Sequence, residues 1–173
     1  MNESSIQAIH RELGVPEDYG RRTGLPLQAI PDELVSIGDD VSGRERFLTP
    51  DAASALAEMI ANAAVDGVVL QVVSAFRSVE YQVRLIKRKL AEGQTIDEIT
   101  RVLAAPGFSE HHSGCAVDLT TPGAQPVEQE FEGTDAFAWL RAHAGRFGFV
   151  LSYPRDNPYG VIYEPWHWRY RGG

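Results

Sequence analysis

The sequence predicts an α+β fold in which helices cover a small antiparallel sheet and an N-terminal segment of helix and coil wraps around them. Two observations lead to this prediction. Several segments carry apolar residues at helical spacing, whereas other short segments are runs of β-branched and aromatic residues typical of buried strands. These segments do not alternate regularly between strand and helix, as a parallel sheet requires, and the chain ends in a pair of strands.

The chain is short enough to form one domain. It has 173 residues, of which 43% are hydrophobic and 23% are charged, as in a typical globular protein. We expect residues 1–173 to form a single domain, with an N-terminal wrap over 1–48 and a catalytic core over 49–173. Within the wrap, residues 2–13 are expected to form a short helix, and the many glycines and prolines of 14–48 predict coil.

The core is expected to contain four helices and four strands. The helices should begin where a hydroxyl side chain can cap the first turn and an apolar stripe follows. Their predicted starts are Thr49, Ser78, Thr95 and Thr134. The predicted strands cover residues 68–74, 114–119, 149–152 and 161–170.

Charge and patterning exclude several classes of partner. The 16 Lys and Arg residues against 24 Asp and Glu residues give a net charge of −8, which argues against nucleic acid and anionic membranes. No apolar run reaches the roughly 18 residues of a transmembrane segment.

The first residues carry neither the basic nor the apolar region of a secretory signal, and a lone cysteine fits a reducing compartment. We therefore expect a cytoplasmic protein, or a periplasmic one if the natural chain begins earlier.

Two dense polar clusters, at residues 109–118 and 164–169, hold three of the five histidines. From them, His111, Asp118 and His167 offer two imidazoles and one carboxylate, a standard ligand set for catalytic zinc that leaves a fourth position for water. Taken singly, each is more simply a polar loop residue or the end of a strand. Asp118, however, lies inside an apolar strand, where an unpaired carboxylate is costly to bury, and this favours one Zn²⁺ per chain.

The neighbours of these residues refine the choice of ligands. Glu164 stands three residues before His167, so one segment can bring both a ligand and a base to the same metal. Alternation along the strand turns Cys115 away from Asp118, so we expect the thiol to pack in the interior rather than to bind metal. We leave out His112, because it cannot easily share the direction of the histidine beside it.

Three motifs of the sequence resemble those of the VanY-type D-alanyl-D-alanine carboxypeptidases. These are zinc peptidases related to VanX dipeptidases, to phage L-alanyl-D-glutamate endolysins and to the hedgehog fold. The combination is specific although each motif alone is weak, and residues 1–73 carry none of them. The motifs are SAFRS at 74–78 followed by Tyr81 and Gln82, Ser-x-His-x-x-Gly-x-Ala-x-Asp at 109–118, and Glu-Pro-Trp-His-x-Arg-Tyr at 164–170.

The resemblance implies a role for each matching residue at the metal. His111, Asp118 and His167 would bind Zn²⁺. Glu164 would be the catalytic base, and Arg77 would stabilise the charge that develops on the scissile carbonyl oxygen.

The resemblance also implies which residues contact the substrate. Gln82 and Ser109 match motif positions near the substrate, and Arg77 is expected to bind it as well. Trp166 would pack beneath the site, line it for substrate and fix the approach of His167.

The activity implied is hydrolysis of the C-terminal D-alanine from peptidoglycan stem peptides. The expected partner is therefore a muropeptide with a free C-terminal D-alanine. The charges of Zn²⁺, Asp118 and Arg77 give the site a net charge of about +2, which suits a terminal carboxylate. L,D-carboxypeptidase activity on tetrapeptides is favoured, because a cytoplasmic D,D-enzyme would attack the cell's own wall precursors.

Three alternatives stay open. The first is D,D-carboxypeptidase activity on pentapeptides, and the second is a phage-type endopeptidase, although such enzymes usually carry a wall-binding domain that is not visible here. The third, of another class, is a non-catalytic zinc-fold binding module. The presence of both Glu164 and Arg77 argues against it, because a pure binder needs neither residue.

Overall fold

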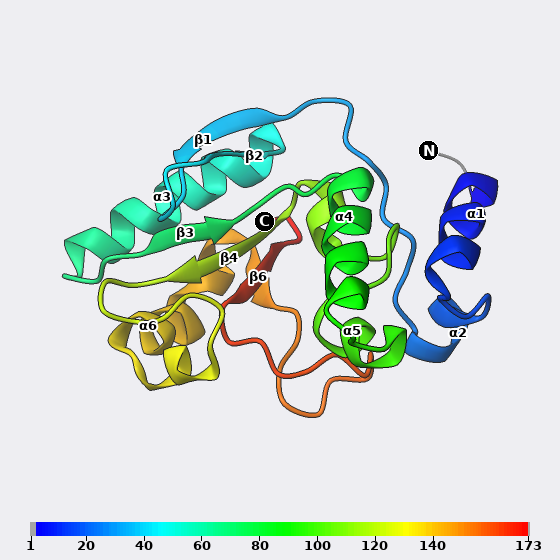
Figure 1. The fold of residues 1–173 in the computed structure, drawn as a ribbon. Coiled ribbons are helices and arrows are strands. Elements are labelled where there is room, and N and C mark those ends of the chain that lie inside the picture. The colour runs from blue at the N-terminus through cyan, green and yellow to red at the C-terminus, as the bar shows by residue number, and fades with distance from the viewer. Residues whose placement is uncertain (1–2, 173) are drawn as a thin grey trace.

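A four-stranded antiparallel sheet lies at the centre of the computed structural model, which describes residues 3–172 (Figure 1). Its strand order is β3-β4-β6-β5, so the last two strands of the chain pair with the middle of the sequence. A separate two-stranded antiparallel sheet is formed by β1 and β2. The strands are β1 (Val35–Asp39), β2 (Glu45–Leu48), β3 (Gln71–Ser74), β4 (Ala116–Thr120), β5 (Phe149–Leu151) and β6 (His167–Tyr170).

Helices surround this sheet, which confirms the predicted α+β class. The α-helices are α1 (Glu3–Leu13), α2 (Tyr19–Thr23), α3 (Pro50–Val65), α4 (Val79–Ala91), α5 (Ile96–Val102) and α6 (Asp135–His143). Three short 3₁₀ helices are η1 (Glu110–Ser113), η2 (Gln129–Gly133) and η3 (Ala144–Phe147). No helix within residues 3–172 has the length and apolar character needed to cross a membrane.

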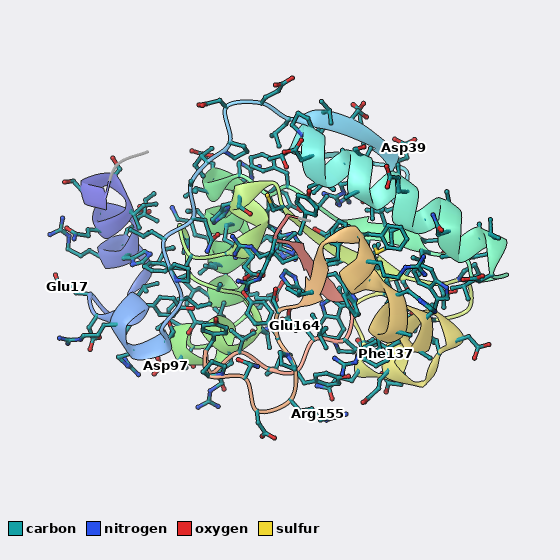
Figure 2. The ribbon with its side chains drawn as sticks, turned by 180° about the vertical axis from the view of Figure 1, so that it is seen from behind. Glu17, Asp39, Asp97, Phe137, Arg155 and Glu164 are labelled. Atoms are coloured by element: carbon teal, nitrogen blue, oxygen red, sulfur yellow. The ribbon has the colours of Figure 1, made fainter. Side chains whose placement is uncertain are left out.

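One face of the sheet is covered by α3 and α6, which lie in front of it when the molecule is seen from behind (Figure 2). Leu56 and Met59 of α3 and Leu140 of α6 are fully buried in one cluster with Leu119 of β4. These apolar residues recur at helical spacing on α3, as the sequence predicted. We call this cluster, with α3, α6 and the four-stranded sheet, the sheet half.

A second hydrophobic cluster lies among α1, α2, α4 and α5, on the side of the molecule away from α3 (Figure 1). Leu13 of α1, Ile86 of α4 and Ile99 of α5 are buried in it. Tyr19 of α2 joins the same cluster and accepts a hydrogen bond on its hydroxyl from the backbone N–H of Ala105. We call this cluster and its four helices the helical half.

Side-chain caps explain where three of the helices begin. Ser78 accepts a hydrogen bond from the backbone of Tyr81 at the start of α4, and Thr134 does the same for Phe137 in α6. Thr95 forms a complete capping box at the start of α5. Helix α3 begins after Thr49 as predicted, but there the first turn relies on proline rather than on a side-chain cap.

The prediction of coil over residues 14–48 was wrong. This segment contains α2 and the β1–β2 hairpin, in which Val35 pairs with Leu48. Val35 and Ile37 alternate with polar residues, and a turn with Gly43 at a φ of 75° follows, so a strand signal was present among the turn formers. Within the predicted helix over 2–13, residue 2 lies outside the described residues.

The strands of the main sheet are shorter than predicted. The strand predicted over 114–119 starts only at Ala116, because Gly114 takes a left-handed conformation that ends η1. The strand predicted over 161–170 pairs only from His167 onward. The backbone N–H groups of Ile162 and Glu164 instead donate to carbonyls outside the sheet, at Arg101 and Tyr153. Pairing of β3 likewise begins at 71 rather than 68.

Candidate metal centre and active site

The register of the sheet brings the candidate ligands together. Asp118 on β4 lies directly opposite His167 on β6 and, on the other side, opposite Ser74 on β3. His111 lies on η1, which is separated from the start of β4 only by Gly114 and Cys115. Because opposing residues of an antiparallel pair point to the same face, this register fixes Asp118 and His167 side by side.

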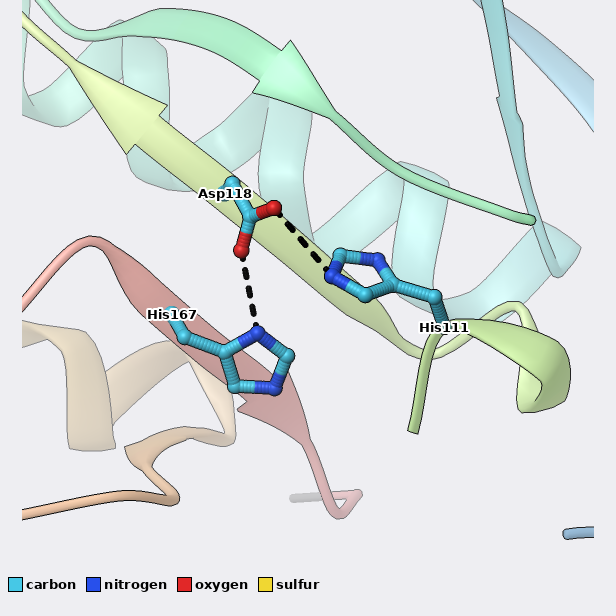
Figure 3. Close-up of side chains that lie close together, drawn as sticks. All are labelled: His111, Asp118 and His167. Carbon is cyan, nitrogen blue, oxygen red and sulfur yellow. Dashed lines mark hydrogen bonds and ion pairs between the residues drawn. The ribbon is translucent and has the colours of Figure 1, made fainter. Parts of the chain in front are cut away.

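Asp118 lies between the two imidazoles and contacts each with a different carboxylate oxygen (Figure 3). Its Oδ2 is 3.2 Å from Nε2 of His111, and its Oδ1 is 3.0 Å from Nδ1 of His167. One ligand atom from each residue lies within 4.8 Å of the others, and all three side chains are buried. The predicted ligand set is therefore assembled in the fold.

Each histidine is oriented by a partner on its far nitrogen. Nδ1 of His111 donates to the carbonyl oxygen of Ala75 at 2.7 Å, which leaves Nε2 to face Asp118. Nε2 of His167 lies 3.0 Å from Oε2 of Glu110, which leaves Nδ1 to face Asp118. Partners of this kind set the tautomer and orientation of metal-binding histidines.

The electrostatics of the group call for a cation among these residues. Burial by itself raises the pKa of Asp118, but the charge of His111 and hydrogen bonds from both histidines outweigh it, and the pKa lies below its usual range. Burial lowers the pKa of His167, yet hydrogen bonds to Asp118 and Glu110 outweigh this and raise it to about 10. In the metal-free protein, protonated His167 therefore places beside Asp118 the positive charge that a metal ion would otherwise supply.

This donor set fits Zn²⁺. Two imidazole nitrogens and one carboxylate oxygen are the ligands of many catalytic zinc sites, and the far nitrogen of each histidine is already engaged. His111, Asp118 and His167 would hold the ion.

Glu164 lies beside this group without belonging to it. A tight turn, in which the N–H of His167 donates to the carbonyl of Glu164, brings its Oε2 to 3.9 Å from Nδ1 of His167. Burial raises the pKa of Glu164 to about 8. Figure 2 shows the residue near the middle of the molecule, whereas Asp97 and Arg155 lie at its edge. It is a carboxylate that can accept and hold a proton next to the metal position.

Arg77 approaches the group from the segment between β3 and α4. Its Nη2 lies 3.9 Å from Oδ2 of Asp118 and donates to Oγ of Ser74. Its Nη1 donates to Oε1 of Gln82 at 3.1 Å. Gln82 is fully buried and donates in turn to the carbonyl of Ala104. The structure thus gives Gln82 a contact with Arg77 and no place in the cavity wall, and its role toward substrate stays a prediction.

A cavity of about 470 Å³ opens over these residues. Ser109 and Trp166 line it, as does Arg77, so three of the four predicted substrate contacts reach this space. The cavity also holds Glu164 and Tyr153 in its wall. Its size is that of a site for a small molecule or a peptide end.

Sequence reasoning missed two residues that contact His167. Glu110 accepts from its imidazole, and the ring of Tyr153 lies with its centroid 4.8 Å from the imidazole centroid. An acidic residue directly before a candidate metal-binding histidine was the available signal for Glu110. Nothing in the local sequence singles out Tyr153, which reaches the site only through the fold.

The residues set aside as ligands stay outside the metal group. Nδ1 of His112 donates to the carbonyl of Arg77 at 2.5 Å. Cys115 is half-buried, and its Sγ lies 3.7 Å from Oγ1 of Thr49.

A buried histidine–aspartate–histidine group with a free carboxylate and an arginine beside it, at the edge of a cavity, is the arrangement typical of zinc-dependent hydrolases. Comparison with known proteins agrees with this class. A profile of the VanY family, described as D-alanyl-D-alanine carboxypeptidase, matches residues 45–173. The chain belongs to the VanY family of D-alanyl-D-alanine carboxypeptidases.

Relatives of known sequence share nearly the whole chain. A D-alanyl-D-alanine carboxypeptidase of Enterococcus faecalis is 35% identical over 98% of this chain and 65% of its own length. The putative carboxypeptidase YodJ of Bacillus subtilis is 27% identical over 98% of this chain and 61% of its own length. The chain therefore spans somewhat less than two thirds of these curated relatives.

Solved structures of similar fold include enzymes of two specificities. The LD-carboxypeptidase LdcB has a TM-score of 0.73 at 30% identity, covering 85% of this chain and 72% of that chain. A mutant of VanY, a vancomycin resistance D,D-pentapeptidase, in complex with Zn(II) has a TM-score of 0.65 at 30% identity, covering 87% and 88%. The zinc expected here is thus present in the structure of a relative.

Proposed function

We propose that this protein is a zinc carboxypeptidase that removes the C-terminal D-alanine from peptidoglycan stem peptides. The observation that carries the proposal is the position of Glu164. It is a buried carboxylate, free of the metal group and 3.9 Å from His167, in the wall of a cavity that also contains Arg77. A binding module has no use for a proton acceptor at this place. Membership of the VanY family supports the choice of reaction.

The side chains around the cavity have different roles in peptide hydrolysis. A bound zinc ion would supply Lewis acidity and make a coordinated water more acidic. Glu164 accepts a proton from the attacking water and can pass it to the leaving amine, which requires a carboxylate that binds protons near neutral pH. Its raised pKa of about 8 in the metal-free protein fits that demand. Arg77, held by Ser74 and Gln82, points a fixed positive charge at the same space and stabilises negative charge on the substrate carbonyl oxygen.

We further propose that the preferred bond is that of an L,D-carboxypeptidase acting on tetrapeptides. The support is the likeness to LdcB, whose TM-score of 0.73 is higher than the 0.65 of the VanY structure. D,D-carboxypeptidase activity on pentapeptides is the second candidate, favoured by the Enterococcus faecalis relative at 35% identity. The compartment of the protein stays a prediction and carries no weight in this choice.

One assay with three peptides tests both levels of the proposal. The zinc-loaded protein is incubated with a free tetrapeptide, a free pentapeptide and a tetrapeptide amidated at its C-terminus, and the products are identified by mass spectrometry. We expect release of D-alanine from the free tetrapeptide with the highest kcat/KM. We expect amidation to lower it by orders of magnitude, because a site built for a carboxylate leaves its own groups unpaired without one.

The other outcomes identify the alternatives. Preference for the pentapeptide would reverse the L,D assignment and keep the carboxypeptidase. Equal cleavage of free and amidated tetrapeptide would point to an endopeptidase. No cleavage of any peptide by the zinc-loaded protein would point to a binding module. The Glu164→Gln protein is the matched control for contaminating peptidases.

A further inference from the structure

The two candidate metal-binding histidines are oriented by partners of different kinds. His111 donates to a backbone carbonyl, that of Ala75, which every residue at position 75 would provide. His167 depends on the side chain of Glu110, whose Oε2 lies 3.0 Å from Nε2. The orientation of one histidine is therefore built into the backbone, and that of the other rests on one carboxylate.

The side chain of Glu110 is buried and fixed in place by arginine side chains. It is only 5% exposed, and its second oxygen, Oε1, accepts from Nη1 of Arg169 at 2.9 Å. Nη2 of Arg171 lies 3.9 Å from the same oxygen. A carboxylate that accepts from a guanidinium on one oxygen presents the other as an acceptor only. The His167 imidazole must then carry a proton on Nε2, the nitrogen that faces Glu110.

The Glu110–Arg169 pair also ties together the two segments that carry the histidines. Glu110 lies on η1 immediately before His111, and Arg169 lies on β6 two residues after His167, on the same face of the strand. The ion pair spans 59 residues of sequence. The contact therefore fixes the position of η1 relative to β6, as well as the orientation of one ring.

We propose that Glu110 is a positioning residue for the metal site. Glu110 fixes the His167 imidazole with its proton on Nε2 and its Nδ1 lone pair toward Asp118. Arg169 holds Glu110 in place for this task. The inference rests on the zinc centre proposed above and is independent of which peptide the protein cleaves. It assigns opposite nitrogens to the two ligands, Nε2 of His111 and Nδ1 of His167.

Zinc affinity, measured by competition with a chelator, tests the proposal without substrate. We expect Glu110→Ala to weaken zinc binding about 10- to 100-fold, the usual effect of removing the outer partner of a histidine ligand. Glu110→Gln keeps an oxygen that accepts from Nε2, so it should recover most of that loss. Glu58→Ala removes the same charge from the exposed face of α3 and should leave the affinity unchanged. A folded Glu110→Ala protein within about threefold of the wild type would overturn the proposal.

A second measurement uses the wild-type protein and stands even if Glu110→Ala fails to fold. In ¹⁵N-histidine spectra of the zinc-loaded protein, long-range couplings identify which ring nitrogen carries the proton. We expect one zinc-bound imidazole protonated on Nδ1 and one on Nε2, the latter exchanging slowly with solvent because Glu110 buries it. Two zinc-bound imidazoles both protonated on Nδ1 would overturn the proposal, because His167 would then bind through the nitrogen that faces Glu110. Neither readout changes if the peptide specificity proposed above is wrong.

Discussion

The sheet half and the helical half of the molecule contribute different kinds of residue to the site between them. Asp118 and His167 lie on paired strands, so backbone register alone sets their spacing. Arg77 and Ser109 lie on the segments that lead into α4 and out of α5, and Arg77 is held by Gln82 of α4. The sheet half therefore supplies two of the three candidate ligands, with His111 added from η1, and the helical half positions Arg77 and Ser109. Changes on the two sides should have separable effects.

The largest effect is expected from removing a ligand in the sheet half. His167→Ala should lose zinc affinity by more than the roughly 10- to 100-fold that loss of an outer partner costs. Elemental analysis of the metal-reconstituted protein checks this. His143→Ala, a change to a histidine of α6 outside the site, is the matched control and should keep its zinc. Full zinc occupancy in His167→Ala would remove this residue from the coordination shell.

Removing the proton acceptor should stop turnover and leave the metal centre intact. Glu164→Gln keeps the shape of the side chain, but an amide cannot accept a proton from water. We expect kcat to fall about 10²- to 10⁴-fold, the usual cost of losing a general base, with unchanged zinc content. Steady-state kinetics on a free tetrapeptide and elemental analysis of the same sample measure both. Activity within a few-fold of wild type would assign the base to another group.

A change in the helical half should disturb substrate handling and spare the metal. Gln82→Ala leaves Nη1 of Arg77 and the carbonyl of Ala104 without their buried partner, which costs about 1–3 kcal/mol of stability. The freed arginine should lower kcat/KM by about tenfold, because small misplacements of a positioned group are costly. Chelator competition should show wild-type zinc affinity. A loss of zinc comparable to that of His167→Ala would contradict the division between the two halves.

The smallest effect concerns the stability of the helical half toward acid. His10 of α1 is buried, its Nε2 donates to the carbonyl of Pro106, and burial lowers its pKa below 6.5. Because the unfolded chain binds a proton more readily, the stability contributed by neutral His10 is complete above about pH 6.5 and falls as the pH decreases below it. His10→Gln keeps a donor that does not titrate. Between pH 7.5 and 5.5 its thermal midpoint should fall about 2–4 °C less than that of wild type. The same decrease of the thermal midpoint in both proteins would show that His10 does not contribute to the loss of stability at low pH.

The sequence predicted that His111, Asp118 and His167 would lie together, and local patterns were enough for this. Asp118 stands in a run of apolar strand residues, where a carboxylate needs a strong partner, and His111 and His167 stand in the two polar clusters at 109–118 and 164–169. The α+β class followed from periodicity in the same way. Each of these signals lies within one short segment of the chain, so it can be read from a single sequence.

Other parts of the site depend on contacts between distant segments. Glu110 becomes important only because His167 and Arg169 approach it from 57 and 59 residues away. The β1–β2 hairpin was missed for a different reason. Its alternating pattern at Val35 and Ile37 is short and lies among many glycines and prolines, whose turn-forming tendency dominates a local reading. The extent of β6 was overestimated because extended residues before His167 look like a strand but pair with loops.

The pairing of Asp118 with His167 has a consequence for the lifetime of the folded chain. These two residues are 49 positions apart, so a metal that holds both closes a long loop between β4 and β6. A cross-link of this kind resembles a disulfide, which restricts the unfolded chain more as the loop grows longer. The two strands must pair before both residues can reach the ion, so the link acts late in folding. Removal of the metal by a chelator should therefore raise the unfolding rate much more than it lowers the refolding rate. The bound metal would thus slow the separation of β4 from β6 and extend the lifetime of the folded protein.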